Sequence, residues 1–354
     1  MKNDLTCGLV RDLLPSYVDG LLGPESREAV DRHLADCPGC SAALAAMKAP
    51  EGEAGPEAEE QTREVDYLKR VKKRNAWKIV LAVACTAGAL FAALLLKAFV
   101  IGTPFQPELM AAVGTVEGDT LHLSLMSVTS AHAFHSWRVE IKDGTASIYA
   151  RDVLVSPLFS NGGGAVDVPL DGVREVWLGG PEGKLLWQDG MTISRLARDL
   201  MDAKTPYCGD PTAMARITEL LRLPVYFGSY TFSLQTSDRP YAWTIESANP
   251  LNDDQLRLAD AHNMLALALV GNLEVSRYVC PGREGKPETV GSLTLEEADG
   301  TLLPQMVAEY NAAHGTDWAP KPSVKDYART PADLQRLLLI LGSYHGLDLS
   351  LTGI

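Results

Sequence analysis

The residues with the clearest chemistry lie within the first 40 positions. Cys7 is followed by His33, Cys37 and Cys40 in the run His-Leu-Ala-Asp-Cys-Pro-Gly-Cys. His33 and Cys37 are four residues apart, so a helix places them on one face. The Pro-Gly turn brings the Cys40 thiolate to the same point, and Cys7 supplies a fourth ligand. A closed tetrahedral Cys3His set suits zinc best, so the sequence predicts a structural zinc site.

Two other interpretations of these residues stay open. The Cys-x-x-Cys pair could act in redox chemistry without a metal, or the cysteines could be small core residues. His33 and the distant Cys7 complete a tetrahedron, which favours zinc over both alternatives. Zinc binding and redox sensing are also compatible, because thiolates that bind a metal can be oxidised and release it.

The residues around this set predict a small all-α domain over residues 1–48. An amphipathic stripe over residues 9–18 ends at Gly20, a second helix begins at Gly23-Pro24, and a third contains Ala43, Leu44 and Met47. About 45 residues bury too little apolar surface for reliable stability, whereas structural zinc contributes ~10–16 kcal/mol of apparent binding free energy to folding. We therefore expect the metal to hold this domain together.

Residues 4–48 resemble the zinc-finger family of anti-sigma factors. The resemblance rests on Cys7, Leu13-Leu14-Pro15-x-Tyr17-x-Asp19-Gly20, Pro24-Glu25 and His33-x3-Cys37-x2-Cys40. It implies that the helices hold a sigma factor of the extracytoplasmic-function type away from RNA polymerase until a signal arrives. It also implies that a regulatory protease releases the sigma factor by cutting the outer part and the membrane span.

A membrane span is predicted over residues 76–101. The 18 residues from Ile79 to Leu96 carry no charge and are bounded by Lys78 and Lys97. On a helix these lysines lie ~28 Å apart, close to the ~30 Å thickness of the hydrocarbon core. A buried core helix seldom runs this long, and a cleaved signal peptide would lie nearer the N-terminus. Cys85 within the span is interpreted as a small apolar residue.

The flanking charges predict the orientation of this span. The N-terminal side carries Lys69, Arg70, Lys72, Lys73, Arg74 and Lys78, whereas residues 102–118 contain no Lys or Arg. The positive-inside rule then predicts a single-pass protein of the cell membrane, with a cytoplasmic N-terminus and an extracytoplasmic C-terminus. Within residues 49–75, an acidic stretch (49–66) is expected to be a flexible tether. The basic stretch after it is expected to contact the lipid bilayer, to set topology, or both.

The sequence pattern after the span predicts two further domains, so we expect a multidomain protein. Alternating patterns and turn signals over residues 103–192 predict an extracytoplasmic β-rich domain of antiparallel strands. Residues 193–354 predict an α+β domain with C-terminal helices. Its elements are expected as helices at 193–201, 211–221, 254–270, 304–314 and 331–344, and strands at 225–234, 241–246 and 273–279.

Residues 197–285 resemble an uncharacterised extracytoplasmic domain of anchored regulators in Gram-positive-type bacteria. The resemblance rests on Tyr207-Cys208-Gly209-Asp210, Gly228-Ser-Tyr230-Thr231-Phe232, Gln235-Thr236-Ser237, Asn263-Met264 and Gly271-Asn272-Leu273. It implies a family and no activity. Cys208 and Cys280 lie near the ends of this region, and either a disulfide or two buried thiols fits their positions.

Two histidines in the β-rich region were candidates for chemistry. His132 and His135 are three apart and would share a helical face. No third ligand or nearby carboxylate lies at a metal-site spacing, so we expect structural histidines.

Composition and missing motifs exclude several function classes. The net charge of −13, from 45 acidic and 32 basic residues, argues against direct nucleic-acid binding. The outer part contains no Gly-x-Ser-x-Gly, Ser-x-x-Lys, His-Glu-x-x-His or Walker motif, so an enzyme is not predicted.

Two functions remain. One is an anti-sigma factor that responds to an envelope signal, in which Thr86 and Gly88 would ease unwinding of the span for a protease. The other is a membrane-anchored extracytoplasmic ligand- or partner-binding protein whose zinc module is only structural.

Overall fold

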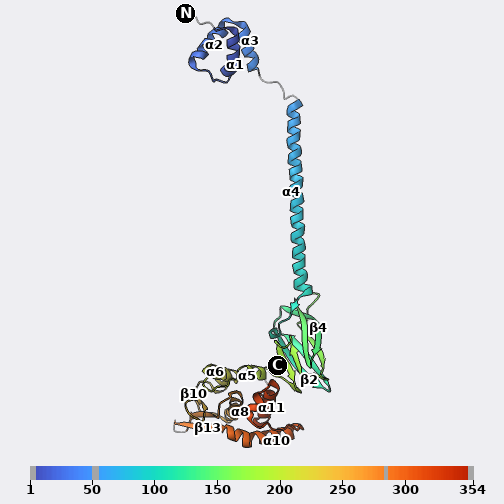
Figure 1. Cartoon of the computed structure of the whole chain (residues 1–354), viewed down its shortest axis with the longest axis vertical. Coiled ribbons are helices and arrows are strands. Elements are labelled where there is room, and N and C mark those ends of the chain that lie inside the picture. Colours follow the sequence, from blue (N-terminus) through green and yellow to red (C-terminus); the bar gives the residue numbers. More distant parts are fainter. Residues whose placement is uncertain (1–4, 50–55, 283–285, 350–354) are drawn as a thin grey trace. The chain divides into compact units, whose positions relative to one another are not determined.

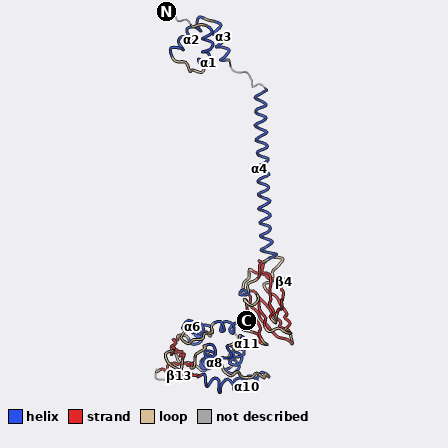
Figure 2. The backbone as a smooth tube through the Cα atoms, viewed as in Figure 1, coloured by secondary structure: helices blue, strands red, loops and turns tan. Residues whose placement is uncertain are grey.

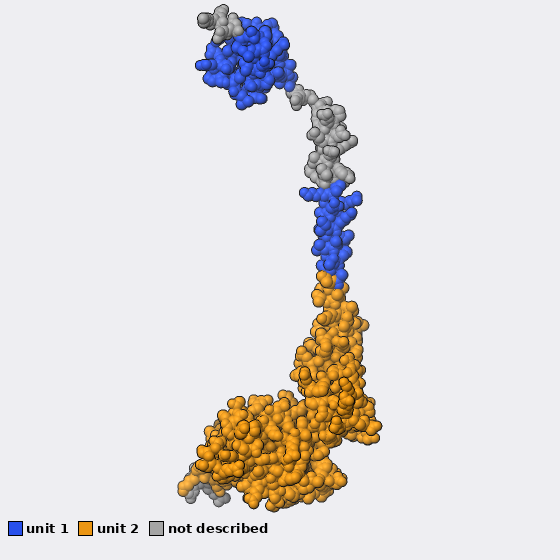
Figure 3. All heavy atoms as spheres, viewed as in Figure 1, with its two compact units in different colours: residues 1–89 blue, residues 90–354 orange. Residues whose placement is uncertain are grey.

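The protein is described by a computed structural model that covers residues 5–49, 56–282 and 286–349. By its internal contacts the chain divides into two compact units, residues 1–89 and 90–354 (Figure 3). Within the described residues the first unit is helical, whereas the second contains all of the strands (Figure 2). The predicted fold class is confirmed, with a small helical module, one candidate span, and β-rich and α+β regions.

The first unit begins with three short helices, α1 (Cys7–Val18), α2 (Pro24–Asp36) and α3 (Pro38–Lys48), shown in Figure 1. Proline at the first position pre-organises both α2 and α3, since its missing N–H has no partner in a first turn anyway. The fully enclosed core is small. It consists of Val10 and Leu14 of α1, Val30 of α2 and Cys40 of α3.

A long helix, α4 (Pro56–Leu96), follows and continues into a π-helical turn, η1 (Lys97–Ile101). Its portion from Val71 to Ile101 is 31 residues long, is not buried, and is long and apolar enough to cross a membrane. The expected flexible tether over 49–66 is wrong from Pro56 onward, where the chain is helical. Alanine, glutamate and glutamine favour helix over an extended tether there. Residues 50–55 of the expected tether lie outside the described residues.

The second unit begins with two β-sheets. One contains β2 (Met110–Glu117), β3 (Thr120–Ser127) and β6 (Gly163–Pro169) in the order β2-β3-β6. The other has the order β1-β5-β7-β8-β9, with β4 also paired to β5. Its strands are β1 (Thr103–Pro104), β4 (His132–Lys142), β5 (Thr145–Leu154), β7 (Glu175–Leu178), β8 (Lys184–Gln188) and β9 (Met191–Thr192).

Side chains of both sheets share one core, which includes Leu121, Leu123 and Leu125 of β3 with Ala146 and Ile148 of β5. Alternate residues of β3 and β6 are buried, as expected for a half-buried sheet, whereas Leu185–Gln188 of β8 are buried in succession. The pairing of β5 with β7 is parallel, whereas every strand had been expected to be antiparallel. The chain between these strands forms β6 in the other sheet, so β5 and β7 are not joined by a hairpin.

The α+β region surrounds the sheet β10-β11-β12-β13. Its strands are β10 (Tyr230–Gln235), β11 (Ala242–Ser247), β12 (Val275–Pro281) and β13 (Pro287–Thr294). Its helical elements are α5 (Arg195–Asp202), α6 (Pro211–Leu220), α7 (Leu223–Phe227), α8 (Asp253–Leu269), α9 (Leu295–Glu297), η3 (Ala298–Leu302), α10 (Leu303–His314), η4 (Val324–Ala328) and α11 (Pro331–His345).

Helix α8 connects the parallel pair β11 and β12 and is the buried centre of this region. Asn252 caps its N-terminus and forms a capping box with Gln255. The strand predicted at 225–234 is wrong at its start, because residues 225–227 belong to α7 and β10 begins at Tyr230. Pro224 near the helix start favours this turn, and Gly228, with φ +68°, ends it.

Hydrogen bonds join the β-rich and α+β regions within the second unit. The amide of Ala332 donates to Gln188 over 3.1 Å, and the guanidinium of Arg336 donates to the carbonyl of Asp189 over 3.2 Å. Gln188 is buried. These bonds cross the boundary predicted between residues 192 and 193, and the domain boundaries themselves remain predictions.

Cys208 and Cys280 are buried free thiols, so the alternative of two reduced cysteines describes this structure. The Cys208 Sγ lies 3.7 Å from the carbonyl oxygen of Ala242, to which it donates. Burial raises the pKa of Cys208 above its ordinary value, which keeps it a neutral thiol.

The buried His262 predicts acid sensitivity of this region. Its Nδ1 lies 3.1 Å from the Tyr278 hydroxyl, and burial lowers its pKa from 6.5 to about 3. The unfolded chain therefore binds a proton between these values and the folded chain does not, so stability falls as pH falls through this range. We expect His262 to account for a loss of about 2–3 kcal/mol between about pH 7 and about pH 4.5.

Urea unfolding followed by tryptophan fluorescence would measure this loss. His262→Gln remains neutral throughout, so its stability should decline less with acidification than that of the native chain. Equal declines in both proteins would show that His262 does not cause the acid sensitivity.

Candidate metal centre

The structure brings Cys7, His33, Cys37 and Cys40 together from three helices. Cys7 is the first residue of α1, His33 lies in the last turn of α2, and Cys40 lies in the first turn of α3. The four ligand atoms all lie within 4.8 Å of one another. No other group of three or more His, Cys, Asp or Glu side chains is close enough to share a metal in the described ranges 5–49, 56–282 and 286–349.

The distances within this group fit a tetrahedral zinc ion. The Cys7 Sγ lies 3.5 Å from the His33 Nε2 and 3.7 Å from the Cys37 Sγ. Zinc bonds of about 2.3 Å to sulfur and about 2.0–2.1 Å to nitrogen, at tetrahedral angles, give S···N of about 3.6 Å and S···S of about 3.8 Å. A disulfide would instead require about 2.05 Å between sulfurs. Three thiols with one imidazole are also the donors that zinc prefers.

The break between α2 and α3 explains how three of the four side chains converge. Cys37 has an extended backbone, with φ −119° and ψ 103°, and it ends α2. Its amide still donates to the carbonyl of His33 over 2.9 Å, so the histidine stays one turn away. Pro38 then starts α3 at once, and its first turn carries Cys40 back toward the group.

The four side chains differ in exposure. Cys7 is exposed, His33 and Cys37 are half-buried, and Cys40 is buried. Cys40 packs with Val10 and Val30 in the core of the module. The group therefore lies at the edge of the core, where a metal would connect all three helices.

The local hydrogen bonds prepare Cys37 to bind a cation. The backbone amide of Cys40 is the largest influence on its sulfur, with the Cys7 side chain next, and together they lower the pKa of Cys37 to about 6. Cys37 is therefore largely a thiolate at neutral pH, and the thiolate is the form that binds metal. Burial raises the pKa of Cys40, and the neighbouring thiols add to this effect.

His132 and His135 lie on strand β4 and not on a helix, so they do not share a face in the expected way. A carboxylate is also close to one of them, contrary to the expectation from spacing. Asp152 of β5 lies 2.7 Å from the Nδ1 of His132, whereas His135 pairs with Ser136. Pairing of β4 with β5 brings His132 and Asp152 together across 20 positions, which local spacing cannot show.

Comparisons with known proteins support a zinc-binding module at the N-terminus. A family model described as "Putative zinc-finger" matches residues 7–41, which include all four clustered side chains. A model for a domain of unknown function (DUF4825) matches residues 200–291. These matches confirm both family resemblances noted in the sequence.

A curated relative, the anti-sigma-YlaC factor YlaD of Bacillus subtilis (strain 168), is 32% identical over 92 residues. The aligned part is 26% of this chain and 95% of the relative. No solved structure matches the chain.

Zinc removal is predicted to unfold the module. The native chain should carry one zinc, Cys40→Ser should lose it, and Cys85→Ser, which lies outside the group, should retain it. Because the enclosed core is so small, the loss of ~10 kcal/mol or more of apparent binding free energy should leave the three helices unfolded.

Metal analysis and hydrogen exchange over residues 7–48 would test this expectation. A chelated chain whose α1–α3 amides keep their full protection would contradict it.

Proposed function

The chain belongs to the anti-sigma factor family with a zinc-finger module, and from that premise we propose that residues 1–48 sequester a sigma factor of the extracytoplasmic-function type. The observation that carries the proposal is the match to nearly the whole length of an anti-sigma factor, together with a converged Cys3His group. The four clustered residues act here as structural ligands. They fix the helices that present a docking surface and do not take part in a reaction.

The surface of the module supports a protein partner. Among its described residues, 5–48, four large apolar side chains are exposed, namely Leu9 (49%), Val18 (38%), Leu21 (76%) and Met47 (50%). So many exposed apolar residues on so small a module suit burial against another protein. Anti-sigma activity needs such a surface and needs no catalytic group.

We further propose that the chain is anchored by one span, with the module in the cytoplasm and residues 103–354 outside the cell membrane. The charge asymmetry around the apolar run supports this orientation. The exposed side chains of the apolar segment within Val71–Ile101 are consistent with contact to lipid, because an apolar helix left unburied in water would be unfavourable. The outer unit would then respond to an envelope signal.

Release of the sigma factor by regulated proteolysis is part of the proposal. Within α4, the Thr86 hydroxyl donates to the carbonyl of Ala82 over 2.9 Å, and Gly88 has open space around it. A helix that offers an alternative hydrogen-bond donor and a glycine is easier to unwind locally. An intramembrane protease requires such unwinding at its cleavage site.

The second candidate function is an outer ligand- or partner-binding protein with a purely structural zinc module. It is favoured by the extent of the outer unit, which lies mostly beyond the part matched by the anti-sigma relative. The two functions differ in whether a sigma factor binds the module.

Affinity capture distinguishes these functions. Tagged full-length chain, solubilised in mild detergent, should recover a sigma factor from cytoplasm, and the Cys37→Ser/Cys40→Ser double variant should not. Leu21→Asp should weaken recovery about tenfold or more, since it removes the burial of one leucine. Leu158→Asp is the matched control, because Leu158 is 73% exposed in the other unit. Capture of no sigma factor by the native chain would favour the second function.

The protease step predicts that Thr86→Leu/Gly88→Leu slows signal-induced cleavage of the span. Both replacements strengthen the local helix by removing the hydroxyl and the glycine. Immunoblotting for the cytoplasmic fragment after an envelope stress would measure the rate. Cleavage at the native rate would rule out unwinding at these two residues.

A further inference from the structure

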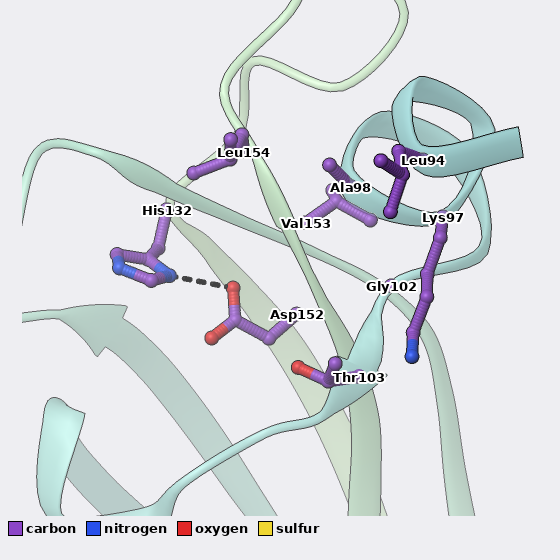
Figure 4. A pocket seen from close by; sticks show the side chains of 9 residues that line it. All are labelled: Leu94, Lys97, Ala98, Gly102, Thr103, His132, Asp152, Val153 and Leu154. Carbon is purple, nitrogen blue, oxygen red and sulfur yellow. Dashed lines mark hydrogen bonds and ion pairs between the residues drawn. The ribbon is translucent and has the colours of Figure 1, made fainter. Parts of the chain in front are cut away.

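A pocket of about 320 Å³ lies where the long helix meets the β-rich region of the second unit (Figure 4). Leu94 and Ala98 form one wall, and Val153 and Leu154 of β5 form another. The remaining lining residues are Lys97, Gly102, Thr103, His132 and Asp152. The volume is at the lower end of the range for small-molecule sites.

The joint beside this pocket is closely packed. The Gly102 amide donates to the carbonyl of Lys97 over 2.8 Å, and Gly102 has φ +70°. A Cβ at that position would lie 2.4 Å from the Asp152 carbonyl oxygen, so only glycine fits. Strand β1 then pairs with residues 151–152 of β5. The pocket is therefore bounded by a fixed helix end on one side and a sheet strand on the other.

The walls of the pocket differ in chemistry from one part to another. Leu94 and Ala98 are four residues apart on one helix face, and Figure 4 shows them beside Val153. Lys97 extends away from this apolar group. The Asp152 side chain is only 10% exposed, and its carboxylate lies 2.7 Å from the Nδ1 of His132. This carboxylate therefore already has a partner within the protein. The pocket thus offers a hydrocarbon-like wall with a single lysine at its edge.

The position along the helix identifies the kind of molecule that would meet this wall. Leu94 belongs to the uncharged run and Lys97 ends it, so the pocket begins where hydrocarbon gives way to headgroups. Lysine at such a boundary places its ammonium among lipid phosphates. Acyl chains are the most abundant apolar groups at that depth, and the wall supplies few polar groups for a soluble ligand.

We propose that this pocket is a phospholipid site, in which an acyl chain lies against Leu94, Ala98, Val153 and Leu154 and the phosphate lies near the Lys97 ammonium. The site depends on the helix spanning a membrane and not on sigma-factor binding. A failure of the lipid site would therefore leave the proposed anti-sigma function unaffected, and a failure of the anti-sigma function would leave the lipid site unaffected.

Photo-crosslinking of the full chain in phosphatidylcholine vesicles tests the site. The probes are phosphatidylcholine and phosphatidylglycerol, each with a diazirine near the end of one acyl chain, and a free fatty acid with the same group. Crosslinks from the phospholipids should appear on Val153 and Leu154, which lie outside the apolar run. Crosslinks from the free fatty acid alone would overturn the assignment to a phospholipid.

Two matched pairs of variants locate the bound lipid. Ala98→Trp fills the pocket and should lower the β5 crosslinks about tenfold, as expected when about two methylene groups lose their contacts. Ala93→Trp makes the same change at an exposed position outside the pocket and should leave them unchanged. Lys97→Gln should lower phosphatidylglycerol crosslinking about fivefold, whereas Lys78→Gln, at the other end of the run, should not.

Thermal unfolding monitored by tryptophan fluorescence checks that the variants keep the outer fold. If Ala98→Trp destabilises it, Leu154→Ser, at a position 41% exposed, tests the same wall with less disturbance. Absence of phospholipid crosslinks on β5 of the native chain would overturn the proposal. The proposal would also be overturned if a pocket variant that keeps the outer fold and its matched control gave equal crosslinking on β5.

Discussion

The convergence of three thiols and one imidazole is the constraint on which the N-terminal module depends. Its three helices enclose only Val10, Leu14, Val30 and Cys40, far less apolar surface than a stable domain of this length needs. A zinc ion held by these four side chains would connect the start of α1, the end of α2 and the start of α3 at one point. The apolar residues that a larger core would bury, such as Leu21 and Met47, are then free to stay exposed. If a metal supplies the stability of the module, its apolar side chains do not have to form a core. They can then form a surface that binds a partner.

The outer unit is held together differently, by two cores and by hydrogen bonds between its regions. Gln188 accepts a hydrogen bond from the Ala332 amide, and the Asp189 carbonyl accepts one from the Arg336 guanidinium, both across the predicted domain boundary. At the other end of the β-rich region, Gly102 and β1 fix the last turn of the long helix against β5. The strand that lines the pocket is therefore the same strand that fixes the helix end. A displacement of β5 is also a displacement of the helix end, because no loose linker separates them.

How well the sequence predicted these features depends on how local their causes are. The Cys3His group was predictable because three of its members lie within eight residues and helix geometry determines their directions. The membrane span was predictable from composition alone. The pairing of His132 with Asp152 and the parallel pairing of β5 with β7 were not, since each depends on strands that meet only in the folded sheet. The helix from Pro56 was missed because acidic, alanine-rich composition suits both a tether and a helix, and length and continuity with the span favour the helix. The ligand roles of the four residues and the domain boundaries remain predictions.

Membership of the anti-sigma factor family concerns about a quarter of the chain, so the outer unit needs a physical account of its own. In the proposed topology a span separates the two, and a signal crosses it either by movement of the helix or by its cleavage. Movement requires a continuous helix, and α4 contains no proline beyond its first residue. Cleavage requires local unwinding, and Thr86 with Gly88 lowers its cost near the middle of the apolar run. These requirements are compatible because they act at different positions. The joint at Gly102 would couple movement of the helix end to β5. Thr86 and Gly88 lie several turns away, so local opening there would leave this joint intact.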